Sequence, residues 1–323
     1  MEIVNKKKPE FCLQGIVLIT FVKGKIMLSI DPKNIEVPQL HRYLLGAVGP
    51  RPIAFASTMD RNEVSNLAPF SFFNAFSANP PILVFSPARS GRTNTTKDTY
   101  NNVKELPEVV INVVNYDLVH QMSLASSPYP SNIDEFVKSG LTPMASELVK
   151  PFRIKESPVQ FECRVNQVIE LGDQGGAGNL IICEVLKIHI SEGILDEKGM
   201  IDQYKIDLVS RMGGNWYCRA EQNSMFEIPK PITTCGIGYD ELPQDILNSQ
   251  ILTANNLGQL AGIESIPNET DVNEYKLLEL SELFLSLEDD AQQLEIEIHK
   301  KAKLLLEENL LEEAWLTLLS FNN

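Results

Sequence analysis

Apolar residues occur in short runs through the first two thirds of the chain, and Pro or polar residues bound each run. Residues 52–58 (PIAFAST), 81–86 (PILVFS) and 108–114 (EVVINVV) have this character, which is typical of buried β-strands. Residues 159–166 alternate instead. One face would carry Val159, Phe161, Cys163 and Val165, and the other Gln160, Glu162, Arg164 and Asn166. This alternation predicts a strand with one apolar and one polar face.

A glycine-rich loop at 172–178 (GDQGGAG) separates that strand from a second apolar segment, 179–190, and the pair predicts a long hairpin. The Gly-x-x-Gly spacing also occurs in dinucleotide-binding loops, but those loops follow a strand and open a helix. Here the β-branched residues Ile181, Ile182 and Val185 follow, so we reject a Rossmann fold. Strands joined mainly by hairpins predict a mainly β fold with helices between the strands, closed as a barrel.

In about the last 80 residues, the spacing of the apolar positions changes from the pattern of strands to that of helices. Leucine and aromatic residues recur there at helical spacing, in one stripe of Leu277, Leu280, Phe284 and Leu287 and in another of Leu304, Leu311, Trp315 and Leu318. We expect two or three helices with acidic outer faces, packed on the barrel or on a partner subunit. The predicted organisation is an N-terminal extension at 1–26, a barrel domain at 27–235 and an acidic helical C-terminal extension at 236–323.

The N-terminal segment places basic residues before an apolar run, as a signal peptide does. The run at 11–22 is far too short to span a bilayer, and Lys23, Gly24 and Lys25 follow it in place of a small-residue cleavage site. We therefore interpret residues 1–26 as an extension, with the barrel domain opening at Met27, and expect no membrane partner.

Charge is distributed unevenly. The chain has a net charge of −15, and residues 240–323 hold 18 Asp and Glu against four Lys and Arg. The remainder is close to neutral, so no basic face is available to neutralise phosphates, and we expect no nucleic-acid partner.

The five cysteines and four histidines lie far apart, without a CxxC or HxxxH pair. Spacing therefore predicts no metal site. Scattered cysteines without a disulfide framework fit a reducing compartment, and we expect the protein to be cytoplasmic.

Residues 63–81 (EVSNLAPFSFFNAFSANPP) set four Phe residues among small and polar neighbours. A buried strand would be richer in Val and Ile, and an amphipathic helix would not contain Pro69 near its start. Aromatic surface, small residues and backbone polar groups together suit a flat ligand that is hydrogen-bonded along its edge.

The neighbouring segments supply hydroxyl groups and cations. Residues 56–60 (ASTMD) end a strand on two hydroxyls, and 86–106 combine Ser, Thr, Arg and Lys with the start of a helix. Such a helix N-terminus suits a phosphate, although an N-capped helix after a polar turn has the same pattern. A flat ring and a phosphate held by a β-barrel suggest FMN.

The ordered set GPRPIAFAST, NLAPFSFF, PPILVFSP and KDTYNNV resembles the flavin reductase-like, FMN-binding split-barrel family, the flavoredoxin relatives in particular. The resemblance covers about residues 27–235. It implies a split β-barrel and a homodimer with the flavin at the dimer interface, to which Trp216 or Tyr217 would contribute.

The resemblance also implies site residues. Ser57 and Thr58 would lie near the ribityl chain and flavin edge. The isoalloxazine would be lined, largely by backbone, by Asn66, Leu67, Ala68, Ser71, Phe72 and Phe73. The phosphate end would gather Ser86, Arg92, Lys97, Asp98 and Thr99. Because a carboxylate repels phosphate, we expect Asp98 to cap the helix or to orient Lys97.

The flavin carries the electronics of hydride transfer, so we expect no catalytic side chain, in keeping with the absence of a Ser/His/Asp pattern. The leading hypothesis is an NAD(P)H-dependent FMN reductase, or a flavoprotein that passes electrons from bound FMN to an acceptor. The alternative is a non-enzymatic, flavin-binding electron carrier whose acidic tail docks a partner.

Overall fold

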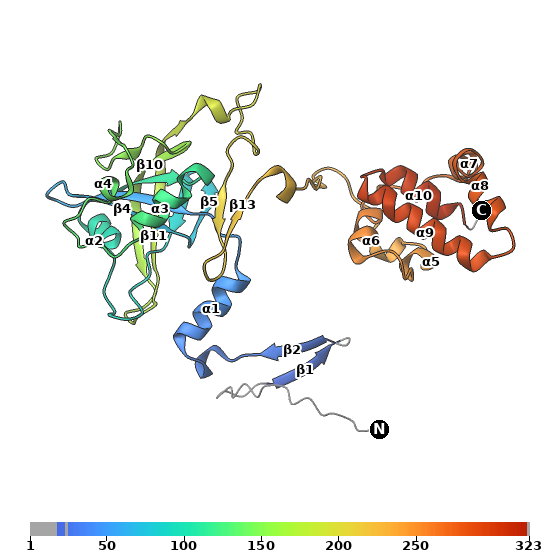
Figure 1. The fold of residues 1–323 in the computed structure, drawn as a ribbon, viewed down its shortest axis with the longest axis horizontal. Coiled ribbons are helices and arrows are strands. Elements are labelled where there is room, and N and C mark those ends of the chain that lie inside the picture. The colour runs from blue at the N-terminus through green and yellow to red at the C-terminus, as the bar shows by residue number, and fades with distance from the viewer. Residues whose placement is uncertain (1–17, 23–24, 322–323) are drawn as a thin grey trace. The chain divides into compact units, whose positions relative to one another are not determined.

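Two units make up the chain in the computed structural model, with the boundary between Phe226 and Glu227 (Figure 1). The structure describes residues 18–22 and 25–321. Most of the predicted N-terminal extension therefore lies outside the described residues. Its described part forms the antiparallel hairpin of β1 (Leu18–Val22) and β2 (Lys25–Ser29), so the predicted boundary after residue 26 falls inside a strand. The boundary between the two units lies nine residues before the predicted one, which follows Cys235.

Seven antiparallel strands form the central sheet of the first unit, the barrel unit. Their order is β4 (Ser65–Phe70), β3 (Ala54–Met59), β7 (Glu108–Val113), β10 (Val159–Glu170), β11 (Asn179–Ile190), β6 (Pro81–Phe85) and β5 (Phe73–Ala78). Every strand predicted from an apolar or alternating run is present. The residues that set four Phe among small neighbours form both edge strands, β4 and β5.

The connection between the two edge strands requires the sheet to curl. Six steps of about 4.8 Å would hold the edges of a flat sheet about 29 Å apart. Only Ser71 and Phe72 join β4 to β5, and this link spans at most about 11 Å. The rings of Phe70 and Phe85 lie 5.6 Å apart, and Phe72 O accepts a hydrogen bond from Ser86 N at 2.9 Å. The sheet therefore closes into a barrel, split between β4 and β5.

The sheet has an apolar cluster on each face. The inner cluster fills the barrel and includes Val103 of α2 (Asp98–Glu105), with Ala54, Ala56, Phe85, Ile111, Cys163, Ile181 and Cys183. The outer cluster lies under α3 (Val119–Ala125) and α4 (Glu135–Ser139), and includes Phe55, Leu67, Met122, Phe136 and Ile154. The three helices pack against β4 (Figure 1). Residues of β3 thus alternate between the two clusters, as the period of a strand requires.

The polar face of β10 is partly buried. The side chain of Glu162 is fully buried, and it accepts hydrogen bonds from the N–H groups of Glu147 and Leu148 at 2.6–3.1 Å. His189 Nε2 lies 2.7 Å from Glu162 Oε1. Burial raises the pKa of Glu162, but these hydrogen bonds outweigh it and leave the pKa below its ordinary value. The buried carboxylate is stable because each neighbour donates to it.

Short elements complete the barrel unit. They are α1 (Val37–Ala47), the pair β8 (Pro143–Met144) and β9 (Arg153–Ile154), and the hairpin β12 (Val209–Arg211) and β13 (Tyr217–Arg219). Arg51 is buried and donates to the carbonyl oxygens of Leu45 and Met212 at 2.8 Å, and also to that of Val48. It therefore joins the C-terminal end of α1 to the residue after β12.

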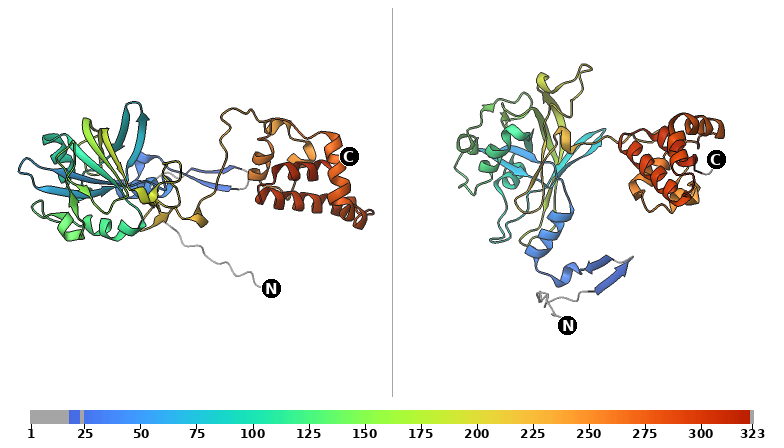
Figure 2. Two further views of the ribbon diagram at one scale, coloured as in Figure 1. Left: turned by 90° about the horizontal axis from the view of Figure 1, so that it is seen from above. Right: turned by 45° about the vertical axis from the view of Figure 1, so that its right-hand side comes forward.

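The second unit, the helical unit, is built from helices around its own core. They are α5 (Gln244–Leu247), α6 (Ala254–Leu260), α7 (Glu269–Tyr275), a π-helical turn (Lys276–Leu280), α8 (Ser281–Ser286), α9 (Ala291–Glu307) and α10 (Leu311–Leu319). The long helices α9 and α10 lie side by side (Figure 2). Trp315 is fully buried, and its Nε1 donates to Leu260 O at 3.1 Å. Among the described residues, none of the helices has the length and apolar character needed to cross a membrane.

The two predicted leucine stripes are each wrong at one residue. Leu277 is 73% exposed, because the π-helical turn changes the helical phase at that point. Leu304 is 60% exposed, because α9 directs Leu294, Ile298, Ala302 and Leu306 into the core instead. The other stripe residues are buried or partly buried, as predicted.

Candidate functional site

A polar network lies where α2 meets β3 and β4. Asn66 Nδ2 donates to Thr58 Oγ1 at 3.0 Å and to Thr99 Oγ1 at 2.9 Å. Asn102 Nδ2 donates to the same Thr58 oxygen at 3.2 Å. Three of the residues predicted to bind the cofactor are therefore brought together from three different elements. The sequence prediction omitted Asn102, although it lies one helical turn after Thr99 and shares its face.

No strand within residues 18–22 and 25–321 pairs with the outer edge of β4. Asp60 N donates to Val64 O at 3.1 Å, so the alternation of an antiparallel ladder bonds Asn66 and Ala68 to β3. The backbone groups of Ser65, Leu67 and Pro69 then face outward, and Pro69 fits there because it has no N–H to leave unpaired. Leu67 is fully buried, so backbone contact with a ring at this edge is limited to the partly exposed Ser65 and Pro69. The backbone polar groups of Asn66 and Ala68 are directed toward β3, and the placement of these two residues against the ring stays a prediction.

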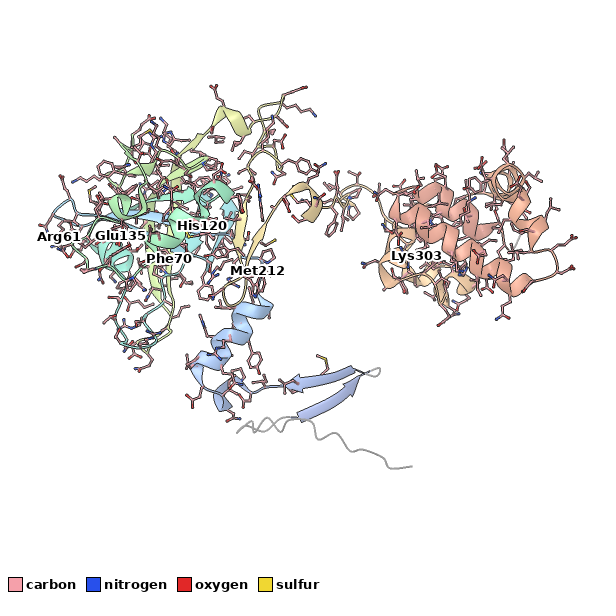
Figure 3. The ribbon with its side chains drawn as sticks, viewed as in Figure 1. Arg61, Phe70, His120, Glu135, Met212 and Lys303 are labelled. Atoms are coloured by element: carbon pink, nitrogen blue, oxygen red, sulfur yellow. The ribbon has the colours of Figure 1, made fainter. Side chains whose placement is uncertain are left out.

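Glu135 occupies part of this edge. Its Oε2 accepts a hydrogen bond from Leu67 N at 3.1 Å, and the residue is buried at the first position of α4 (Figure 3). Burial raises the pKa of Glu135, and the negative charges of Asp134 and Asp98 act in the same direction. Sequence reasoning missed this residue, because an acidic residue in the first turn of a helix is common without any ligand.

Ser57 faces away from the polar network. It pairs with Leu67, whose side chain lies in the outer cluster, whereas the neighbouring Thr58 turns toward α2. The Ser57 side chain is fully buried, and its Oγ has no hydrogen-bond partner among the described residues. The two predicted hydroxyls thus lie on opposite faces of β3. The Ser57 hydroxyl is therefore a buried polar group without a partner on the outer face of β3, in the part of the chain that the structure describes.

The N-terminus of α2 has no side-chain cap. Lys97 is the N-cap residue and is exposed, and Asn101 N is the first helical donor to find a backbone acceptor, Lys97 O at 3.1 Å. Thr96, which could cap the helix, donates to Asn101 Oδ1 at 2.8 Å instead. Side chains cap α4, α6 and α9, whereas α1, α3, α5 and α10 resemble α2 in having no side-chain cap. The first-turn N–H groups of α2 therefore remain available to an anion.

Asp98 does not have the predicted role. It is the first residue inside α2 and not the cap, and no ion pair or hydrogen bond among the described residues joins it to Lys97. A carboxylate at this position is compatible with the positive end of the helix dipole. It neither caps the helix nor orients the lysine.

The loop that precedes α2 packs on the glycine-rich loop at 172–178. Arg89 N donates to Ala177 O at 2.8 Å, and Gly176 N donates to Arg89 O at 3.0 Å. A Cβ at Gly178 would lie 2.7 Å from Ser86 Oγ, so a larger residue there would force the Ser86 side chain or the loop to shift. The glycine-rich loop therefore supports the loop at 86–97, in agreement with the rejection of a Rossmann fold.

Two arginines in the loop before α2 differ in how they are held. The guanidinium of Arg89 donates to Asn94 at 2.7–2.8 Å, so it stabilises the loop itself. Arg92 is exposed, and among the described residues its guanidinium has no hydrogen-bond or ion-pair partner. Arg92 in the loop and Lys97 at the uncapped helix end are thus two cations without a carboxylate partner among the described residues. The role of Arg89 could not be predicted from the residues around it.

The link between the edge strands holds the remaining predicted residues. Ser71 Oγ lies 3.5 Å from Arg51 Nε, Phe72 is 39% exposed, and Phe73 packs on the inner cluster. His41 meets the Phe72 ring edge-on, with 6.4 Å between ring centroids. Trp216 is 77% exposed in the β12–β13 turn. Within residues 18–22 and 25–321, no group of three or more His, Cys, Asp or Glu could hold a metal ion.

These features agree with comparisons to known proteins. The family profile described as "Flavin reductase like domain" matches residues 47–206. An uncharacterized protein of Aquifex aeolicus is 37% identical over 188 residues, which make up 58% of this chain and 93% of that protein. The chain belongs to the flavin reductase-like family.

Solved structures show the same fold. The chain is similar to nitrilotriacetate monooxygenase component B from Bacillus cereus, with 30% identity and a TM-score of 0.58 over 62% of this chain and 98% of that one. It is also similar to a Shewanella frigidimarina protein with a split barrel domain, with 23% identity and a TM-score of 0.52 over 61% and 95%. The predicted fold class, a split β-barrel followed by C-terminal helices, is confirmed.

Proposed function

We propose that the barrel unit binds FMN and transfers electrons, either from NAD(P)H to flavin or from bound FMN to an acceptor. When bound, FMN would supply the two-electron chemistry, and the chain would bind and orient it. The single observation that carries the proposal is the uncapped N-terminus of α2, which leaves first-turn N–H groups beside Lys97 in a member of the flavin reductase-like family. A phosphate is the anion that such a helix end best accommodates.

The other residues of the site fit the rest of this cofactor. The outward backbone groups of Ser65 and Pro69 on β4 offer hydrogen-bonding positions, since no strand among the described residues pairs with that edge. The partly exposed ring of Phe72 offers apolar surface next to the same strand. Arg92 and the Ser86 hydroxyl lie in the loop that leads to α2. A polar edge, an aromatic surface and an anion site together match the parts of FMN.

Lys97→Ala tests the phosphate part of the proposal. The change should weaken FMN binding by on the order of 1.5–3 kcal/mol and leave riboflavin binding nearly unchanged, because riboflavin lacks the phosphate. Fluorescence titration of both ligands measures the difference. Lys104→Ala is the matched control, since Lys104 lies on the same helix but pairs with Glu170 at 3.3 Å. Equal losses for the two ligands would remove Lys97 from a phosphate site.

Two assays test the reaction. The purified protein, loaded with FMN, should oxidise NADH or NADPH steadily, and added free flavin should stimulate the rate. A protein that binds FMN but does not oxidise either nucleotide would instead be an electron carrier, the alternative function. The absorption spectrum of the purified protein tests the cofactor itself. A protein that shows no flavin bands after incubation with FMN and desalting does not hold FMN as a bound cofactor.

We include a homodimer in the proposal. Strand β5 pairs on one side only, and Phe76 on it is 67% exposed, close in sequence to the partly exposed Phe72. An exposed aromatic edge strand is a surface that proteins normally cover. Analytical ultracentrifugation should give twice the mass of the chain, and Phe76→Ser should shift the protein toward the monomer. A monomeric wild-type protein that binds FMN normally would remove the dimer from the proposal.

A further inference from the structure

The helical run at 269–286 presents leucine on both of its sides. It consists of α7, the π-helical turn and α8 in direct succession. Its inward side supplies Val272 and Leu280, both at most 1% exposed, together with the partly buried Leu283 and Phe284. These four side chains pack the run against the helical unit, and the other leucines of the run do not take part in that packing.

Three leucines on this run lie outside the core. Leu277, Leu278 and Leu285 are each 72–73% exposed within the described residues. A π-helix advances each residue by about 80° and an α-helix by about 100°. Leu285 therefore lies within about 60° of both Leu277 and Leu278 around the axis, and the three form one apolar stripe. We call these three residues the leucine face.

The leucine face is unusual because its three exposed leucines lie next to one another. Single exposed leucines are normal on protein surfaces, but three on one helix face form a patch that soluble proteins usually cover. The π-helical turn is responsible, because an α-helical phase would place Leu277 on the same side as Leu280 and Phe284. π-helical turns of this kind are found frequently at functional sites.

Carboxylates surround the leucine face. Glu274 and Glu282 lie about one turn before and after Leu278 and are exposed, and Glu288 and Asp289 follow the end of α8. The nearest lysine side chains contact other groups. Lys276 lies over the Phe284 ring at 4.3 Å, and Lys301 Nζ donates to Glu279 O at 3.1 Å. The whole unit from residue 227 holds 19 acidic and five basic residues.

We propose that the leucine face is the docking surface for a basic amphipathic helix of a partner protein. An apolar stripe along a helix is covered best by a second helix, whose residues at i, i+3, i+4 and i+7 pack against it. The flanking carboxylates require that the polar margins of this second helix carry Lys or Arg. The barrel unit, which holds 24 acidic and 23 basic residues, has no comparable charge to attract such a partner.

A designed peptide of about 18 residues tests the proposal, with Leu at helical spacing and Lys elsewhere. The full-length protein should bind the fluorescently labelled peptide, and binding should weaken as salt is raised. Replacement of Leu277, Leu278 and Leu285 together by Ser should weaken binding at least about tenfold, because the apolar contact is lost. Leu304→Ser is the matched control, since Leu304 is 60% exposed on α9 and outside the face, and it should leave binding unchanged.

Further measurements distinguish helix docking from a general attraction between opposite charges. Glu274→Gln with Glu282→Gln should reduce the salt dependence while the leucines stay in place. Hydrogen exchange should show protection at 269–286 on binding. The proposal is overturned if the triple Ser variant binds as wild type, if the wild type does not bind, or if a scrambled peptide of the same composition binds equally. A change of oligomeric state in the triple variant would also overturn it, since a second copy would then cover the face. None of these outcomes depends on FMN.

Discussion

The two units of the chain bury different kinds of side chain. The barrel unit buries polar and charged groups within and beside its sheet, among them Thr58, Glu135 and Glu162. The helical unit buries mainly Leu, Ile and Trp315, with His299 as its one buried ionisable residue among those described. The barrel unit is nearly neutral, whereas the helical unit is strongly acidic on its surface.

This difference indicates where each unit derives its specificity. Buried carboxylates must be matched by donors from distant parts of the chain, so the barrel geometry is fixed by particular hydrogen bonds. A leucine core tolerates more variation in its contacts but loses stability with every cavity. The two units should therefore respond differently to the same kinds of change, and four predictions test this.

The largest effect should follow from Trp315→Ala. The indole is fully buried and donates to Leu260 O, so its removal leaves a large cavity and an unpaired carbonyl. We expect the helical unit to lose about 3–5 kcal/mol of stability, while the barrel unit keeps its melting temperature and its FMN affinity. Calorimetry should show a shift of one transition only. A matching loss in the barrel transition would show that the units are not independent.

Glu162→Gln should destabilise the barrel unit by roughly 1–3 kcal/mol, because the charge that accepts from Glu147, Leu148 and His189 is lost. The lowered pKa of Glu162 also predicts a pH dependence. The stabilisation is present above the ordinary value of 4.5 and is lost as pH falls through the lower folded-state value. The variant should therefore unfold in acid with a shallower slope. Wild-type and variant slopes that coincide would exclude Glu162 as the titrating group.

His299 predicts acid sensitivity of the helical unit at a higher pH. Burial lowers the pKa of His299, whose Nδ1 lies 2.7 Å from Ser249 Oγ. The folded unit thus favours the neutral ring, and stability is lost as pH falls below 6.5, the ordinary value. The helical transition should move down by a few degrees between pH about 7.5 and 5.5, and the shift should be smaller in His299→Gln. The barrel transition serves as the internal control.

We expect the smallest effect on stability from Glu135, and its pH dependence should be opposite to that of Glu162 and His299. Its pKa is raised chiefly by burial, so its protonated form favours the folded barrel. Stability from this group is full below the ordinary value of 4.5 and is lost as pH rises through the folded-state value. Glu135→Gln keeps an acceptor for Leu67 N and removes the titration, so the barrel should lose less stability than the wild type over that rise. Thermal melts of wild type and variant across this range measure the difference.

Five of the seven strands of the sheet were predictable from sequence, because β3, β6, β7, β10 and β11 are apolar or alternating runs bounded by Pro, Gly or polar residues. The edge strands β4 and β5 were not, because their small and polar residues lack the Val and Ile of a buried strand. Burial of Glu162 was not, since its donors at 147 and 148 lie on a separate segment whose position only the fold determines. The exposed Leu277 escaped prediction because the α-helical period of 3.6 residues does not hold through a π-helical turn.

The candidate site was predictable in part. Thr58, Asn66 and Thr99 were named from sequence and lie in one hydrogen-bonded network. Ser57 was grouped with Thr58, but successive residues of a strand face opposite sides. Glu135 carries no sequence signal, because its role depends on the unpaired edge of β4. The assignment of the named residues to FMN stays a prediction.

The two-residue link between β4 and β5 has a consequence for how the barrel is assembled. Three hairpins, β3–β4, β5–β6 and β10–β11, can form from local chain alone. The pairing of β6 with β11 aligns Phe85 with Ile181, about 100 residues apart along the chain. Bringing such distant segments together costs loop-closure entropy before the contacts repay it, and this slows folding. Because the link holds the first two hairpins together, we expect the pairing of β6 with β11 to form late and to complete the barrel.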